Sequence, residues 1–141
     1  MTTIVKKVKF DAAHLLSGDA GKCGNLHGHG YQVEVEVAGG DDGDMVVDFR
    51  ELKRVIEEKV LSRLDHAFIC CTESPVEREF AAVAERNGMR VCALPYRSTC
   101  ENIAKYIYGE IAEAGVTAVR VRETEDNSAE YRPERKEAQN A

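Results

Sequence analysis

The sequence has no tryptophan and only three prolines among its 141 residues, and no hydrophobic run approaches the length of a membrane span. Basic residues are not in excess either, because 19 Lys and Arg stand against 25 Asp and Glu, giving a net charge of −6. This acidic balance argues against nucleic acid and anionic membranes as partners. The N-terminal segment also lacks an apolar stretch of signal-peptide length, so we expect a cytoplasmic protein.

The five cysteines do not follow the pattern of a disulfide framework. Their number is odd, Cys70 and Cys71 are adjacent, and the C-x-x-C motif of redox proteins does not occur. Cys92 and Cys100 are most simply small buried residues. We therefore expect reduced thiols, and Cys23 is the one whose neighbours suggest chemistry.

Alternation of polar and apolar residues predicts the main strands. The alternation is clearest over residues 29–38, where glutamine and glutamates alternate with valines, and residues 4–16 follow a similar pattern. A turn of glycine and aspartate at 39–44, followed by the apolar run 45–47, predicts an antiparallel hairpin. Further short strands are expected at 89–94, at 116–124 and near 130–131.

Three helices are expected between these strands. Asp48 as N-cap, with Glu51 in the capping-box position, starts a helix that continues to about residue 64. Ser74, followed by proline, starts a second helix over residues 74–88. A third helix begins at Ser98 or Thr99 and presents isoleucines at helical spacing to the core.

Length and pattern together predict a single domain over residues 1–132 with a polar tail at 133–141. Antiparallel strands with helices between them make an α+β fold with helices packed on one face of the sheet. The other sheet face would stay open. Such a sheet commonly closes on neighbouring subunits, which also protects its edge strands, so we expect a homo-oligomer.

The segment from Cys23 to His29 brings a thiol and two imidazoles within seven residues. His27 and His29 are two positions apart, so in an extended segment both rings point to the same face. Pairing of neighbouring strands can add His14 to them. Three neutral imidazoles with one open position form the ligand set of a catalytic zinc, and a thiol close by suits a base or a nucleophile.

Two plainer interpretations stay open on the residues alone. His27 and His29 could be ordinary turn and strand histidines, with Cys23 a small buried residue. Cys23 could also be a fourth protein ligand that closes a structural zinc site. The clustering of these residues with His14, and with glycines that allow close backbone approach, favours the catalytic interpretation.

Six motifs along the chain occur in the order seen in one known family. They are FDAAH at 10–14, KCGNLHGH at 22–29, VDF at 47–49, LDH at 64–66, TCEN at 99–102, and ET at 123–124 with Tyr131. Together they resemble the 6-pyruvoyl-tetrahydropterin synthase / 6-carboxytetrahydropterin synthase family, over about residues 4–132. The resemblance implies the tunnelling fold (T-fold), a four-stranded antiparallel sheet with helices on its outer face. It also implies trimers that pair into hexamers, with active sites at subunit interfaces.

The resemblance also implies roles for individual residues. The implied ligands of Zn²⁺ are His14, His27 and His29. The implied catalytic residues are the Cys23 thiol and its proton-relay partners Asp65 and His66. The implied substrate-binding residues are Glu123, which would anchor a pterin ring, and the further pocket candidates Thr99 and Glu101. Candidates to bind a triphosphate are Lys22, Arg97, Arg120 and Arg122.

The spacing of the thiol separates branches of the family. Three residues lie between Cys23 and His27, as in the 6-carboxytetrahydropterin synthases of queuosine and 7-deazaguanine biosynthesis. The implied reaction converts 7,8-dihydroneopterin triphosphate to 6-carboxytetrahydropterin, acetaldehyde and triphosphate. The alternatives are a 6-pyruvoyl-tetrahydropterin synthase and a non-catalytic zinc- or pterin-binding module. Residues 74–88 resemble an insertion relative to the shortest members, and we interpret them as a solvated surface helix.

Overall fold

The computed structural model describes residues 1–39 and 42–134. Its six strands form one sheet in the order β4-β3-β1-β2-β5-β6. The strands are β1 (Thr2–His14), β2 (His27–Gly39), β3 (Ala67–Cys71), β4 (Val91–Leu94), β5 (Val116–Arg122) and β6 (Ser128–Tyr131). The pairs β1/β2, β2/β5 and β5/β6 are antiparallel, as the sequence predicts, whereas β3 runs parallel to both of its neighbours, β1 and β4. The expected polar tail lies outside the described residues from residue 135 onward.

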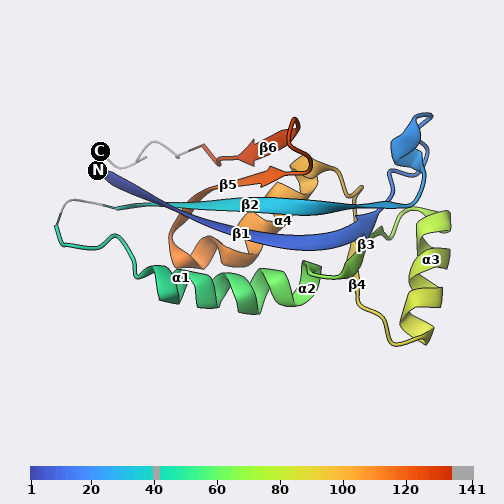
Figure 1. Ribbon diagram of the computed structural model, residues 1–141, viewed down its shortest axis with the longest axis horizontal. Coiled ribbons are helices and arrows are strands. Elements are labelled where there is room, and N and C mark those ends of the chain that lie inside the picture. The colour runs from blue at the N-terminus through green and yellow to red at the C-terminus, as the bar shows by residue number, and fades with distance from the viewer. Residues whose placement is uncertain (40–41, 135–141) are drawn as a thin grey trace.

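The helices cover mainly one side of this sheet. They are α1 (Phe49–Ile56), the π-helical turn η2 (Glu57–Leu61), α2 (Ser62–Leu64), α3 (Pro75–Arg86) and α4 (Cys100–Ile111), with short 3-10 turns η1 (Lys22–Gly24) and η3 (Ala112–Ala114). Figure 1 shows α4 running behind the sheet and α1 with α2 below it. The predicted α+β class with helices packed on one face is therefore confirmed. No helix within the described residues is both long and apolar enough to traverse a membrane.

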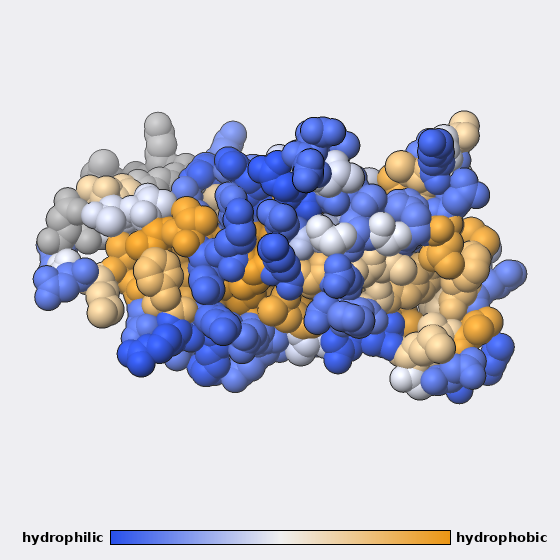
Figure 2. Space-filling model, viewed as in Figure 1, coloured by the Kyte–Doolittle hydropathy of each residue, from blue (hydrophilic) through white to orange (hydrophobic). Residues whose placement is uncertain are grey.

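Strict alternation along β2 divides the sheet into a dry face and an open face. Tyr31, Val33 and Val35 are fully buried under α1, η2 and α4, where they join the main apolar core. On the other face, Glu34 forms ion pairs with Lys7 of β1 and Arg120 of β5, and Glu36 pairs with Arg132, which follows β6. Figure 2 shows hydrophilic side chains over the central strands on this open face. Apolar burial on one face alone fixes the register, because a slip of one residue would invert both faces.

The predicted hairpin between residues 29–38 and 45–47 is wrong. Residues 45–47 form no strand, because both edges of β2 are already occupied, one by β1 and the other by β5. The partner of β2 in the hairpin is β1. Strand β3 was not predicted from the sequence, because all five of its residues are buried and they show no alternation.

The predicted helix starts are largely as observed, with two differences in detail. Asp48 caps α1 by accepting a hydrogen bond from the Arg50 N–H at 2.8 Å, but Glu51 pairs with Arg54 rather than closing a capping box. Thr99, not Ser98, is the N-cap of α4.

Helix α3 has Ser74 as its N-cap, as predicted, yet it is not solvated on all sides. Glu77 and Ala81 are buried, while Val76, Phe80 and Val83 are exposed. One side of α3 therefore packs on the protein, and the interpretation of residues 74–88 as a plain surface helix is incomplete.

Candidate metal centre and active site

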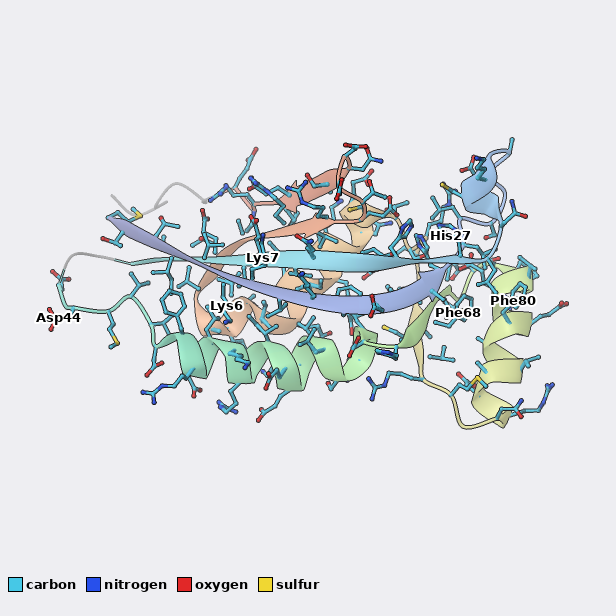
Figure 3. The ribbon with its side chains drawn as sticks, viewed as in Figure 1. Lys6, Lys7, His27, Asp44, Phe68 and Phe80 are labelled. Atoms are coloured by element: carbon cyan, nitrogen blue, oxygen red, sulfur yellow. The ribbon has the colours of Figure 1, made fainter. Side chains whose placement is uncertain are left out.

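The pairing of β1 with β2 brings three histidines to one end of the hairpin. His14 is paired with His27, and Ala12 with His29, so all three rings project from the dry face of the sheet. Their ring centroids lie 4.6–5.2 Å apart. One ring nitrogen of each lies within 4.8 Å of the others. Figure 3 labels His27 at the N-terminal end of β2, beside the loop that connects β1 to β2.

Hydrogen bonds fix which ring nitrogen faces the centre of the cluster. Nδ1 of His14 lies 2.9 Å from the Ser98 carbonyl oxygen, and Nδ1 of His27 lies 2.6 Å from the Asn25 carbonyl oxygen. Because a carbonyl can only accept, each Nδ1 carries the proton, and each Nε2 keeps a free lone pair. This arrangement, with the outer nitrogen held by a backbone carbonyl, is the one found around metal-binding histidines.

The cluster also contains buried polar atoms that lack a hydrogen bond within the described residues. These atoms are the Nε2 nitrogens of His14 and His29. The Glu123 carboxylate lies 3.6 and 3.3 Å from these two atoms, but its geometry does not make a hydrogen bond. Unpaired buried nitrogens are costly, so a further group at the centre is expected. Imidazole donors of this number and spacing fit a zinc ion.

Electrostatics keep the cluster in the state that metal ligands need. The pKa of His14 is lowered to about 4, mainly by burial; the hydrogen bond to Ser98 opposes this shift, and the nearby His27 and His29 add to it. Burial also lowers the pKa of His29, with Glu123 acting in the opposite direction. The environment therefore favours the neutral imidazoles of His14 and His29, and neutral imidazole is the metal-binding form.

The metal-free protein is expected to lose stability as the pH falls from about 6.5 toward 4. The folded pKa of His14, about 4, lies below the unfolded value of 6.5, so only the unfolded chain takes up a proton in this window. The free energy of unfolding should then fall by up to about 3 kcal/mol. Urea unfolding at several pH values in a chelator measures this slope. His14→Gln should lack this component, whereas His66→Gln should keep it; equal slopes in both variants would contradict the assignment.

Cys23 lies in the loop that joins the two strands carrying the histidines. It sits in η1 and is exposed, whereas the other four cysteines are buried. The Leu16 N–H donates to the Cys23 carbonyl oxygen at 2.7 Å, which closes the loop across its base. The next residue, Gly24, lies so close to the Asp19 carbonyl oxygen that a Cβ atom at this position would collide with that oxygen. Cys23 is thus presented to solvent by a tight turn that requires its neighbouring glycine.

Asp65 and His66 form a second cluster, in the connection between α2 and β3. Asp65 Oδ1 accepts from the Asp11 N–H at 3.1 Å and lies 3.0 Å from His66 Nδ1. Burial acts to raise the pKa of Asp65, but these two hydrogen bonds together hold it below its usual value. His66 has a φ of 61°, the only left-handed conformation among the described non-glycine residues. Such backbone strain is common at functional positions.

The two clusters lie on opposite faces of the sheet within one subunit. His14 and Ala12 face the helices, whereas Asp11, which supports the Asp65–His66 pair, alternates to the open face. A pocket on this face is lined by Asp11, Gly30 and His66, among others, and includes none of the three clustered histidines. One chain therefore does not bring His66 together with the three-histidine cluster.

The remaining predicted site residues lie at the end of β5 and at the start of α4. Glu123 directly follows β5 and points at His14 and His29, as described above. Thr99 is the N-cap of α4, and Glu101 is exposed in the first turn of that helix. Sequence reasoning missed the role of Ser98, which is fully buried and holds His14 through its carbonyl and hydroxyl oxygens. Its position next to the TCEN motif was the available signal.

Comparison with known proteins agrees with this arrangement. Residues 3–134 match the family described as 6-pyruvoyl tetrahydropterin synthase. A protein of Haemophilus influenzae named 6-carboxy-5,6,7,8-tetrahydropterin synthase is 35% identical over 139 residues, covering 93% of this chain and 99% of the relative. A protein of the same name from Aquifex aeolicus is 35% identical over 127 residues, covering 80% and 77%. The structure of the Caenorhabditis elegans 6-pyruvoyl tetrahydropterin synthase is similar with a TM-score of 0.69 and 26% identity, covering 94% of this chain and 96% of that one.

Fold, site and relatives together define a pterin synthase with the tunnelling fold. The chain belongs to the 6-pyruvoyl tetrahydropterin synthase family, as its motifs predict.

Proposed function

We propose that this protein is a zinc-dependent 6-carboxy-5,6,7,8-tetrahydropterin synthase. The observation that carries the proposal is the three-histidine cluster with two unpaired buried nitrogens, next to a loop that presents one exposed thiol. Relatives bearing this enzyme name cover most of the chain and support the carboxy branch. The substrates would be 7,8-dihydroneopterin triphosphate and water, and the products 6-carboxytetrahydropterin, acetaldehyde and triphosphate, as in the queuosine route.

His14, His27 and His29 would hold the zinc ion. Bound there, zinc would supply Lewis acidity toward the hydroxyl groups of the substrate side chain. The thiolate of Cys23 would remove the proton from a side-chain carbon that carries a hydroxyl group. The Glu123 carboxylate would accept hydrogen bonds from the N–H groups of the pterin ring, with Thr99 and Glu101 as further pocket residues.

The triphosphate needs cations that are not already engaged. Arg120 pairs with Glu34 and Glu130 on the open face, so it is a poor candidate. Lys22, next to Cys23, and Arg97, next to Ser98, are exposed and border the site. We propose these two as the first contacts to test, by measuring KM after their replacement by alanine.

Mass spectrometry of the products from zinc-loaded protein and 7,8-dihydroneopterin triphosphate tests the proposal. Carboxytetrahydropterin with acetaldehyde is the expected result. Pyruvoyltetrahydropterin alone would instead assign the protein to the other named branch of its family. Unchanged substrate with zinc bound would mean that the site binds rather than catalyses, or that its substrate is a different pterin.

We further propose that the active site is completed by a neighbouring subunit of a homo-oligomer, a trimer that pairs into a hexamer. Within one chain His66 and the three histidines lie on opposite faces of the sheet, so the Asp65–His66 pair would serve the Cys23 site of another copy. The open face, with its cross-strand ion pairs, is available for closure against such copies.

Mixing two inactive variants should therefore restore activity. A composite site is intact when Cys23 comes from a His66→Ala chain and His66 from a Cys23→Ala chain. Random reassembly of equal amounts should recover about a quarter of the wild-type activity. Dissociation, mixing and dialysis followed by the product assay measures this recovery. No recovery, with both variants assembled normally, would place both groups in a single subunit.

A further inference from the structure

Helix α3 forms the support beneath the loop that carries Cys23. Phe68 and Cys70 alternate with the core-facing residues of β3, and they pack with Leu15 and with Ala81 of α3 in a small separate apolar cluster. The rings of Phe68 and Phe80 lie 6.2 Å apart in an edge-to-face contact, and Figure 3 labels both at this junction. The first residue after β1, Leu15, is thus packed against α3.

A buried carboxylate adds a polar connection to this apolar one. Glu77 of α3 has a fully buried side chain. Its Oε1 accepts from the Cys71 N–H at 3.0 Å, and its Oε2 accepts from the Ser17 hydroxyl at 2.5 Å. Each carboxylate oxygen therefore has one partner, one in the sheet and one in the loop. A buried carboxylate is costly without such bonds, so its presence here calls for an explanation.

The Ser17 contact leads directly to Cys23. Ser17 follows Leu16, whose N–H donates to the Cys23 carbonyl oxygen, and the Asp19 N–H donates back to the Leu16 carbonyl at 3.0 Å. The segment from Leu15 to Ser17 is therefore held on α3 at both ends, and Leu16 between them is bonded to η1. We infer that Glu77 is a positioning residue, which fixes the Cys23 thiol through Ser17. This inference rests on the proposed function for its catalytic meaning.

Ser17→Ala is the sharpest variant, because it removes the loop contact and leaves the Glu77 bond to Cys71 intact. We expect kcat to fall about 10- to 100-fold with KM nearly unchanged, because a small displacement of a reacting group is expensive. Amide hydrogen exchange at Leu16 should speed up about tenfold, while exchange within β2 stays unchanged. Ser17→Thr, which keeps the hydroxyl, should restore both quantities. Glu77→Gln retains an acceptor for Cys71 and a group that can bond Ser17, so it should be milder than Glu77→Ala.

Ser62→Ala is the matched control, since the Ser62 hydroxyl donates to the Glu58 carbonyl within η2 and α2 and has no part in the contact between Ser17 and Glu77. It should leave kcat and exchange at Leu16 unchanged. The inference would be overturned if Ser17→Ala kept both the wild-type exchange rate at Leu16 and the wild-type kcat. It would also be overturned if amide protection in this variant fell throughout β2, because the effect would then be a general loss of stability. If Cys23→Ala keeps full activity, the proposed base is wrong, yet exchange at Leu16 still decides whether Glu77 fixes the loop.

Discussion

Replacement of Cys23 by alanine is expected to lower kcat about 10³-fold while the zinc content stays unchanged. A positioned base contributes roughly 10²–10⁴-fold to a proton-transfer step, and alanine offers no group to replace it. Cys23 is the only exposed cysteine of the chain, so its loss should not disturb the core. Steady-state kinetics with carboxytetrahydropterin as the product, together with metal analysis of the same sample, measures both quantities.

Cys92→Ala is the matched control, since it removes a buried thiol outside the cluster. It should keep the wild-type kcat at a temperature where the variant is folded. Loss of zinc in Cys23→Ala would contradict the proposed role of Cys23 as a base. If this variant loses its zinc, and if a cobalt-loaded wild-type protein shows a thiolate-to-metal absorption band, then Cys23 is a fourth ligand. The site would then be a closed structural one.

Replacement of His27 by alanine is expected to abolish zinc binding in the micromolar range and to reduce turnover to background. A lost partner of a metal ligand costs about 10–100-fold in affinity, and the loss of a ligand itself should exceed that. His27 is a better position to test than His14, because His27 is half-buried while His14 is fully buried. Competition with a chromophoric chelator gives the affinity.

The fourth histidine supplies the control for this experiment. His66 is exposed, paired with Asp65, and separate from the cluster, so His66→Ala should keep the wild-type zinc affinity while losing turnover. Circular dichroism of both variants checks that the fold is kept. Wild-type zinc affinity in His27→Ala would remove that residue from the ligand set and leave the metal without a site of three imidazoles.

Much of the fold can be predicted because its signals are local. The alternation in β2, the Asp48 cap and the Ser74-Pro75 start each depend on neighbouring residues, and each element is found in the structure. Predictions failed where distant parts of the chain decide. Residues 45–47 have no free edge of β2 to join, and β3 is buried on both faces, so its residues show no alternation.

The sequence by itself determined the three-histidine cluster, because His27 and His29 share a face at a spacing of two and the motifs place His14 on the neighbouring strand. Only the tertiary structure decided three further points. Ser98 orients His14 across a separation of 84 residues, α3 supports the Cys23 loop through Glu77, and the Asp65–His66 pair faces away from the three histidines. The physical reason is common to all three. Each of these features depends on which distant segments of the chain pack together. Such packing cannot be predicted from the local periodicity of polar and apolar residues.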